Sequence, residues 1–346
     1  MADTALGQLV LTRVREFIRE PEAVFWTLLF PILMTVGLGV AFRSRPEERA
    51  KIAVLASAPA AAPTARLLRA DSSLEVQLLD DSSAAKALRT GKVGLVVVPG
   101  VAGGVEYRFD DTSPGGIAAR RLANDALQRA AGRADPVSVA ERKLRERGSR
   151  YIDFVVPGLL GMCLMGNGIW GIGFALVDAR RRRLLKRLVA TPMSKAAYLG
   201  SFIISRLGLL VIEAGVLLIF AVLAFGVPIR GSWWTLGLTC VLSSLVFAGL
   251  GLLIAARPRT IEGASGLMNL AMVPMWVFSG VFFSASRFPE VIQPLVQALP
   301  LTAVNDALRA SMLEGAGFAQ LFPELAIIVV WIVGTFLLAL KIFRWQ

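Results

Sequence analysis

The stretch FVVPGLLGMCLMGNGIWGIGFALV, residues 154–177, contains no charged side chain and is longer than most core helices of soluble proteins. About 20 mostly apolar residues suffice to cross the hydrocarbon core of a bilayer as a helix. This stretch therefore predicts a transmembrane helix, and the chain has further runs of the same kind. The other predicted spans are residues 23–42, 207–225, 233–256, 264–283 and 325–340. The sequence thus predicts an α-helical membrane protein with six transmembrane helices.

The composition of the 346-residue chain agrees with this class. Apolar residues make up 55%, the mean hydropathy is +0.63 and charged residues are only 18%, below the roughly 25% of soluble domains. Such hydrophobicity excludes an intrinsically disordered chain. The net charge of +12 is divided between two separate regions, described below. We therefore expect a lipid bilayer as surroundings and no nucleic-acid partner.

Several kinds of catalytic and binding site are excluded by residue counts. The chain has no histidine, which removes Ser-His-Asp and Cys-His catalysis, His-ligated zinc and histidine proton relays. Cys163 and Cys240 lie in separate apolar runs, and we expect buried thiols and no metal site. The glycine spacing of a P-loop before Gly-Lys-Ser/Thr is also absent. We therefore expect no cofactor and no ATP site in this chain.

Residues 1–22 precede the first span and predict a different element. Apolar residues recur there at helical spacing, with arginines and glutamates between them. This pattern is typical of an amphipathic helix lying on the cytoplasmic membrane face. A plain anchoring helix explains the periodicity equally well.

Residues 43–150, between the first and second spans, are polar and predict a small α/β domain. The expected strands and helices alternate, with Ser82 as the start of one helix and Ser113-Pro114 as the start of another. The strands are at 51–55, 74–79, 93–98 and 105–109, the helices at 60–70, 82–89 and 113–131, and a charged helix is expected at 136–150.

The membrane orientation follows from lysine and arginine in the short loops. Residues 178–206 hold eight Lys/Arg against one acidic residue, whereas residues 284–324 hold two against four. We therefore place both termini in the cytoplasm and residues 43–150 outside. The 19 Lys/Arg of that domain do not oppose this topology, because long domains translocate largely regardless of charge.

Residues 178–195 form the cytoplasmic loop after the second span, with the sequence RRRRLLKRLVATPMSK at 180–195. A basic run of this kind is usually only a positive-inside anchor. However, Leu184, Leu185, Leu188 and Val189 form an apolar stripe at helical spacing, and Pro192 ends the helix. A short amphipathic helix here could dock a cytoplasmic partner.

Polar residues inside the predicted spans are candidates for a pathway or gate. Arg206 and Glu213 are seven residues apart and share one helix face. Ionised side chains in a membrane cost about 2.5–3.5 kcal/mol on insertion scales and must face protein or water. A structural ion pair and a transport role both satisfy this requirement. Asn167 and Asn269 raise the same question more weakly.

The end of the fifth predicted span suggests a break in the helix. Ser279-Gly280 precedes Phe282 and Phe283, and backbone that re-enters the membrane needs protein or water around it. We therefore expect residues 280–323 to form a re-entrant cap on the outer side.

Taken together, these motifs resemble the membrane subunit of an ATP-binding-cassette exporter, the type 2 permease family, over nearly the whole chain. Arg19-Glu20-Pro21 resembles the family's Arg-Asp-Pro motif before the first span. Residues 185–194 resemble its coupling helix, and residues 274–309 resemble its signature around the fifth span. Many members have Gly-Thr where Arg183-Leu184 stand. The large domain after the first span resembles that of drug- and lipid-export members.

The resemblance implies a half-transporter. Two permease copies, most simply a homodimer, would pair with two ATPase subunits that carry the ATP and Mg²⁺. Access to a cavity at the dimer interface would then switch, and the setting would be a bacterial-type inner membrane. The residues implied in coupling are Phe17, Arg19, Arg183, Leu184, Leu185, Lys186, Arg187, Leu188, Thr191 and Pro192. The candidate pathway residues are Asn167, Arg206, Glu213, Asn269, Ser279, Gly280, Phe282 and Phe283.

Two alternatives remain open at this point. An ion-coupled secondary transporter would use Glu213 as its proton carrier, although the internal repeats of such proteins are not evident. A membrane-anchored enzyme or sensor would use the outer domain, whose paired acids, Asp80-Asp81 and Asp110-Asp111, have the pattern of turn residues. The sequence does not identify the substrate, which could be a drug, a lipid or a lipid-linked molecule.

Overall fold

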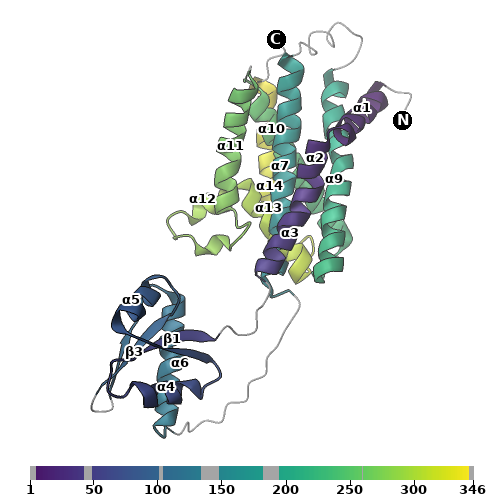
Figure 1. Cartoon of the computed structure of the whole chain (residues 1–346). Helices are drawn as coiled ribbons and strands as arrows, with labels where there is room; N and C mark the ends of the chain where they lie inside the picture. The colour runs from purple at the N-terminus through teal and green to yellow at the C-terminus, as the bar shows by residue number, and fades with distance from the viewer. Residues whose placement is uncertain are drawn as a thin grey trace. The chain divides into compact units, whose positions relative to one another are not determined.

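The computed structural model describes residues 5–42, 49–100, 104–133, 148–181, 195–258 and 260–342. The chain divides into two compact units (Figure 1). One comprises Met1–Arg43 and Arg145–Gln346, and the other is Ser44–Leu144. Each unit has its own apolar core, so each is described by itself.

The described residues of the first unit form helices joined by loops, without a β-strand. Its N-terminal part consists of α1 (Ala5–Arg19), α2 (Pro21–Val24), the π-helical turn η1 (Phe25–Leu29) and α3 (Phe30–Ala41). The long helices that follow are α7 (Tyr151–Arg181), α9 (Lys195–Phe225), α10 (Trp233–Ala255), α11 (Ile261–Phe278) and α14 (Phe322–Ile342). Between α11 and α14 lie η2 (Ala285–Arg287), α12 (Gln293–Ala298), α13 (Pro300–Arg309) and η3 (Ala310–Glu314).

Within the part of the chain that the structure describes, five helical segments are long and apolar enough to cross a membrane. They are Pro21–Ala41, Tyr151–Arg181, Ile204–Phe225, Trp233–Ala255 and Phe322–Ile342. The predicted fifth span, residues 264–283, corresponds to α11, which has 18 residues and is not among these five. It ends earlier than expected, because the helix stops before Ser279. Trp233 and Trp234, at the start of α10, are 66% and 84% exposed, as is typical of aromatic residues at a membrane interface.

The first span contains a wide helical turn with an identifiable cause. Pro31 has no N–H, so it cannot donate to the carbonyl four residues earlier, at Thr27. The N–H of Phe30 instead reaches the carbonyl of Phe25, five residues back. The turn therefore holds one extra residue, a π-bulge. It also leaves Thr27 buried although much of this span is exposed.

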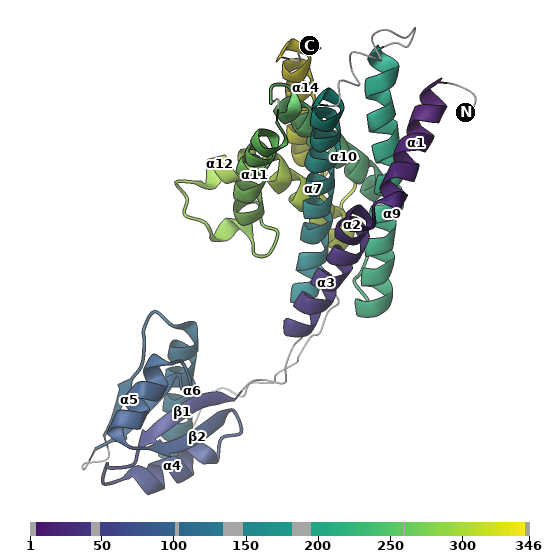
Figure 2. The ribbon, with the colours of Figure 1, turned by 45° about the horizontal axis from the view of Figure 1, so that its top comes forward.

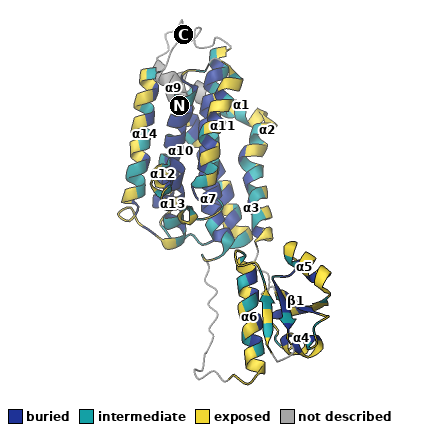
Figure 3. Ribbon diagram, turned by 90° about the vertical axis from the view of Figure 1, so that its left-hand side faces the viewer, coloured by how far each residue is buried: buried dark blue, intermediate teal, exposed yellow. Residues whose placement is uncertain are grey.

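Helix α7 lies at the centre of the first unit, in contact with α3, α9, α10, α11 and α13 (Figure 2). Its glycines allow this close packing, as small residues do between membrane helices. A Cβ atom placed on Gly168 would lie 2.6 Å from the Cβ of Phe247 in α10. Burial follows the same arrangement, with α7 and α10 mostly buried and α14 exposed along one side (Figure 3).

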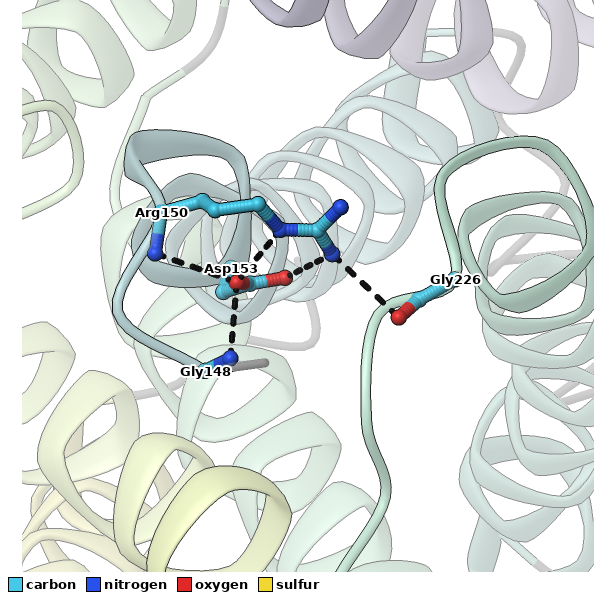
Figure 4. A network of polar contacts seen from close by, with 4 residues as sticks. All are labelled: Gly148, Arg150, Asp153 and Gly226. Atoms are coloured by element: carbon cyan, nitrogen blue, oxygen red, sulfur yellow. Dashed lines mark hydrogen bonds and ion pairs between the residues drawn. The ribbon is translucent and has the colours of Figure 1, made fainter. Parts of the chain in front are cut away.

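The start of α7 is fixed by a network of polar contacts around Asp153 (Figure 4). This carboxylate is fully buried and accepts hydrogen bonds from the backbone N–H of Gly148 at 2.9 Å and of Arg150 at 3.2 Å. The guanidinium of Arg150 also donates to both carboxylate oxygens, at 2.9 and 2.7 Å. A third bond, 3.2 Å long, joins Arg150 to the carbonyl of Gly226, just after α9. The acid therefore caps α7 while its partner ties α7 to the end of α9.

The second unit is a four-stranded sheet with helices on both faces. Its strands are β1 (Ala50–Leu55), β2 (Leu74–Leu79), β3 (Leu95–Pro99) and β4 (Val105–Arg108), in the order β2-β1-β3-β4. The pairs β1–β2 and β1–β3 are parallel, and β3–β4 is antiparallel. Helices α4 (Ala61–Arg69) and α6 (Pro114–Ala130) pack on one face, and α5 (Asp81–Arg89) on the other.

Two helix starts in the second unit compare directly with expectation. Ser113 caps α6 by accepting from the N–H of Gly116, and Pro114 is the first helical residue, as predicted. The prediction that Ser82 starts α5 is wrong, since Asp80 is the N-cap and accepts from the N–H of Ser83. Asp80 also accepts from the Ser82 hydroxyl, and these bonds hold the pKa of its carboxyl below the usual range. The expected helix at 136–150 begins outside the described residues.

Replacing Gly158 with alanine tests the close packing of α7. The new Cβ would lie 2.5 Å from the backbone carbonyl of Val281, which cannot rotate away, and we expect a destabilisation of about 1–3 kcal/mol. Gly166→Ala is the matched control in the same helix, because the nearest atom there is 3.8 Å away on a methionine side chain. Thermal unfolding in detergent should show a lower midpoint for Gly158→Ala alone. Equal midpoints would contradict this packing.

Candidate functional site

A buried ion pair lies within α9 of the first unit. Nη2 of Arg206 donates to both carboxylate oxygens of Glu213, at 3.0 and 2.9 Å. The two residues are 9% and 5% exposed. Two helical turns separate them, so their side chains meet along one face. The structure thus brings together the two charged residues that the sequence placed on one face.

Asn167 of α7 joins this pair. Its amide Nδ2 donates to Oε2 of Glu213 at 2.9 Å, so the carboxylate is shared between two helices. Thr27, in the π-turn of the first span, lies 3.4 Å from the amide oxygen of Asn167, to which its hydroxyl donates. Three membrane-spanning segments therefore meet at this polar cluster of Thr27, Asn167, Arg206 and Glu213.

The stability of the protein depends on neither charged member of this cluster being left without the other. Removing one partner of a buried ion pair leaves an uncompensated charge and commonly costs about 3–5 kcal/mol, whereas replacing both with apolar residues is often neutral. Polar side chains at membrane depth mark functional sites by default. The geometry fits either a structural pair or a polar position beside a transport pathway.

The second feature of the first unit is the chain break after α11. The backbone at Gly280 has a φ of +72°, which favours glycine. The freed carbonyl groups accept hydrogen bonds from side chains of other helices. Nδ2 of Asn305 donates to the Ser279 carbonyl at 2.8 Å, and the Tyr151 hydroxyl donates to the Phe282 carbonyl at 3.0 Å. These contacts satisfy backbone groups that have no helical partner.

Arg309, at the end of α13, completes this arrangement. Its guanidinium donates to the carbonyl of Gly280 and, at 3.3 Å, to the carbonyl of Phe154 in α7. It also lies 3.8 Å from the centre of the Phe154 ring, a cation–π contact. Helix α13 itself is almost fully buried against α7 and α14. The segment after α11 is therefore a cap of loops and short helices locked onto α7.

The opposite end of α7 is also tied to its neighbours. Nη1 of Arg180 donates to the carbonyls of Ala255 and Pro258, at 2.9 and 3.0 Å. Nη2 donates to the carbonyl of Ala256 at 3.3 Å. These carbonyl groups lie at the end of α10 and in the turn before α11, where a helix end leaves carbonyl groups without an intrahelical donor. Arg180 therefore joins the end of α7 to the connection between the next two helices.

The candidate pathway residues chosen from sequence lie at these two sites, with the exception of Asn269. Asn167, Arg206 and Glu213 meet in the polar cluster, and Ser279, Gly280 and Phe282 lie at the break, held by the bonds above. Phe283 is 37% exposed and packs on the ring of Phe288, 5.7 Å away. Asn269 is exposed on α11, apart from both sites.

The coupling residues lie elsewhere. Phe17 is half-buried and Arg19 exposed in α1, a helix that packs against α9. The remaining predicted coupling residues, Arg183 to Pro192, lie outside the described residues.

Sequence reasoning missed several residues that hold these sites. Thr27 and Tyr151 belong to apolar or ordinary sequence and give no local signal. Arg180 belongs to a basic run, although its position at the end of a span is typical of an arginine that binds terminal carbonyls. Asn305 and Arg309 belong to the motif around the fifth span. Their roles can be recognised only when the fold is known, because their partners are distant in sequence.

Comparison with known protein families decides the identity of the chain. Residues 22–341 match the model of the ABC-2 family transporter protein. The chain belongs to this family. It is therefore a multi-pass membrane protein and a transmembrane subunit of an ABC transporter, a class of permease that works with ABC ATPase subunits.

Three relatives illustrate the similarity. The chain is 27% identical over 195 residues to the inner membrane transport permease YadH of Escherichia coli, which covers 55% of this chain and 74% of YadH. It is 25% identical over 177 residues to the linearmycin resistance permease protein LnrN of Bacillus subtilis, over 50% of this chain and 45% of LnrN. The ABC transporter G family member 20 of Dictyostelium discoideum is 26% identical over 187 residues, which cover 54% of this chain and only 26% of that protein.

Substitutions at the ion pair measure how strongly the first unit depends on it. We expect Glu213→Gln to destabilise the protein by about 3–5 kcal/mol, because Arg206 stays buried without its carboxylate. The double variant Arg206→Met/Glu213→Leu removes both charges and should recover most of this loss. The measurement is the unfolding midpoint in detergent. A double variant that is as unstable as Glu213→Gln would show that the pair is not the cause.

Proposed function

We propose that this chain is the permease subunit of an ATP-driven exporter. It moves a hydrophobic or amphipathic compound, such as a drug, a lipid or a lipid-linked molecule, out of the cytoplasm or the inner leaflet. ATP and Mg²⁺ are bound by a separate ATPase subunit. Membership of the ABC-2 family and the lack of a P-loop sequence support this division of labour.

The observation that carries the proposal is the pair of connections made by α7. Its 31 residues span about 46 Å at 1.5 Å per residue. One end holds the cap through Tyr151 and Phe154. The other end runs at Arg181 directly into residues 182–194, which carry the coupling motif. A push on that motif by the ATPase therefore reaches the cap through one continuous helix.

The pathway is proposed to lie between two copies of the permease. Helix α11 leaves one face open, with Leu267, Leu270, Val273 and Val277 between 46% and 71% exposed. The polar side chain of Asn269 is exposed beside them. An asparagine that faced lipid would be costly, so a second permease copy across a substrate cavity is the better surrounding. This face and the cap would together form the outer half of the pathway.

The membrane placement follows the same reasoning. We assign six spans by counting α11 with the five longer helices, both termini to the cytoplasm, and Ser44–Leu144 to the outer side. The loop charges given above support this orientation. The name of YadH, an inner membrane transport permease, supports the same membrane for this chain.

The coupling proposal is tested with two variants of the motif. One is Leu185→Ala/Leu188→Ala, and the other is Thr191→Ala. We expect these changes in the motif to weaken ATPase binding or to uncouple ATP hydrolysis from transport. Leu223→Ala is the matched control, because Leu223 is 80% exposed on α9, away from the motif. Hydrolysis by a candidate partner ATPase is measured after reconstitution of the complex in vesicles. Unchanged binding and hydrolysis in the motif variants would remove the coupling proposal.

The role of the polar cluster is tested with the double variant Arg206→Met/Glu213→Leu. If the cluster lines the pathway, this variant folds normally but transport falls at least about tenfold, equivalent to 1.4 kcal/mol on the barrier. If the pair is only structural, transport stays near the level of the unmodified chain. Transport that needs a proton gradient but no ATP would instead favour an ion-coupled carrier that uses Glu213.

A further inference from the structure

The second unit carries its positive charge unevenly. Residues 61–71 and 114–133, which comprise α4, α6 and the turns after them, contain six arginines and two aspartates. Residues 80–92, which comprise α5 on the other face of the sheet, contain three cations and two aspartates. The excess charge is therefore four on the side of α4 and α6 and one on the side of α5.

The central arginines of this side point away from the sheet. In α4 the buried residues Ala65 and Leu68 face the core, and Arg66 lies on the opposite side of the helix. In α6 the buried residues Ala119 and Ala123 face the core, and Arg121 lies opposite them. Both arginines are exposed, and the two helices contact each other on the same face of the sheet. They therefore form one surface.

Each of these arginines is followed by an exposed leucine. Leu67 is 46% exposed and Leu122 is 39% exposed. An arginine beside an exposed leucine thus occurs once on each helix, at equivalent positions relative to the core. The pattern of cationic and apolar side chains on one surface is typical of elements that lie on anionic membranes.

The two acidic residues on this side are held by partners other than Arg66 and Arg121. Asp125 is held by Arg129 at 2.9 Å and also contacts Arg133. Asp71 accepts two hydrogen bonds from Ser73, at 2.8 and 2.6 Å, which hold the pKa of its carboxyl below the usual range. On the other face, Asp81 and Glu106 both pair with Arg108. The open cationic surface is therefore centred on Arg66 and Arg121.

The second unit is part of the same chain as the membrane-spanning helices, so a bilayer is always within its reach. The chain enters the unit after Phe42 and leaves it before Tyr151, and these two residues lie at adjacent helix ends, with ring centres 4.2 Å apart. Both connections therefore start from the same end of the helical bundle. All six cations of the surface are arginines, whose planar guanidinium binds phosphate oxygens bidentately.

We infer that the outer surface of α4 and α6, centred on Arg66, Leu67, Arg121 and Leu122, docks on a bilayer that exposes anionic phospholipid headgroups. The arginines bind headgroup phosphates, and the two leucines enter the interface between headgroups and acyl chains. This inference does not depend on the transported compound. It gives the second unit a binding surface of its own. It also gives a role to the excess arginines of α4 and α6, which the proposed transport by the first unit does not require.

The test uses the full chain in nanodiscs, with its two cysteines replaced by alanine and one fluorophore attached at Leu122→Cys. Quenching by phospholipids that carry a nitroxide reports contact of the label with the bilayer. We expect quenching in phosphatidylcholine mixed with phosphatidylglycerol, and little in phosphatidylcholine alone. High salt should reverse the quenching, because it screens the attraction between charges. A label at Ala85→Cys, exposed on α5, should stay unquenched in both lipids.

Two charge reversals provide matched variants. Arg66→Glu/Arg121→Glu should lower the docked fraction at least about tenfold, since each cation near an anionic surface contributes roughly fivefold. Lys86→Glu/Arg89→Glu changes the net charge equally on α5 and should leave quenching unchanged. Arg66→Gln/Arg121→Gln, a milder change at exposed positions, guards against a folding defect and should give an intermediate loss.

Other outcomes would overturn the inference. Equal quenching in the two lipid mixtures would remove the requirement for anionic headgroups. An equal loss with the α5 reversal would show a general effect of net charge. Quenching of the label could instead depend on how many copies of the chain each nanodisc holds, and not on its lipid. That result would show that the surface binds a second copy of the chain. Competition by inorganic phosphate with no effect of lipid charge would assign it to a soluble anion.

Discussion

The membrane offers no hydrogen bonds to a broken helix, and this constraint organises the first unit. Where α11 stops, the carbonyl groups of Ser279, Gly280 and Phe282 turn to Asn305, Arg309 and Tyr151. Each donor comes from a helix that must be correctly placed before the break can form. The break therefore fixes α7, α11 and α13 against one another, and the cap depends on all three.

The sequence predicts most of the elements and fewer of their contacts. The Ser113-Pro114 helix start and the Ser279-Gly280 break follow from local chemistry, and the structure has both. The pairing of Arg206 with Glu213 follows from helical spacing. Thr27 could not be predicted, because its contact with Asn167 joins residues 140 apart in the chain. Local rules also cannot choose between neighbouring capping residues, so the sequence predicts Ser82 at the helix start where the structure has Asp80.

The orientation of a side chain around a helix is a second limit. Asn269 and Asn167 are alike in sequence, each a lone amide in an apolar run. One meets Glu213 and the other is exposed on α11, a difference set by packing between helices and not by periodicity. For the coupling motif only the sequence is informative. Its resemblance to a family motif identifies it, and its residues lie outside the described part of the chain.

The π-turn of the first span has a mechanical consequence. A regular helix is a continuous rod, because every N–H reaches back four residues. Pro31 interrupts that ladder, and the turn at Phe25–Leu29 reaches back five. The first span is thus jointed, with α1 and α2 on one side of the joint and α3 on the other. Thr27 anchors the joint to Asn167, so the widened turn itself is held against α7, while α1 packs on α9 and α3 on α7.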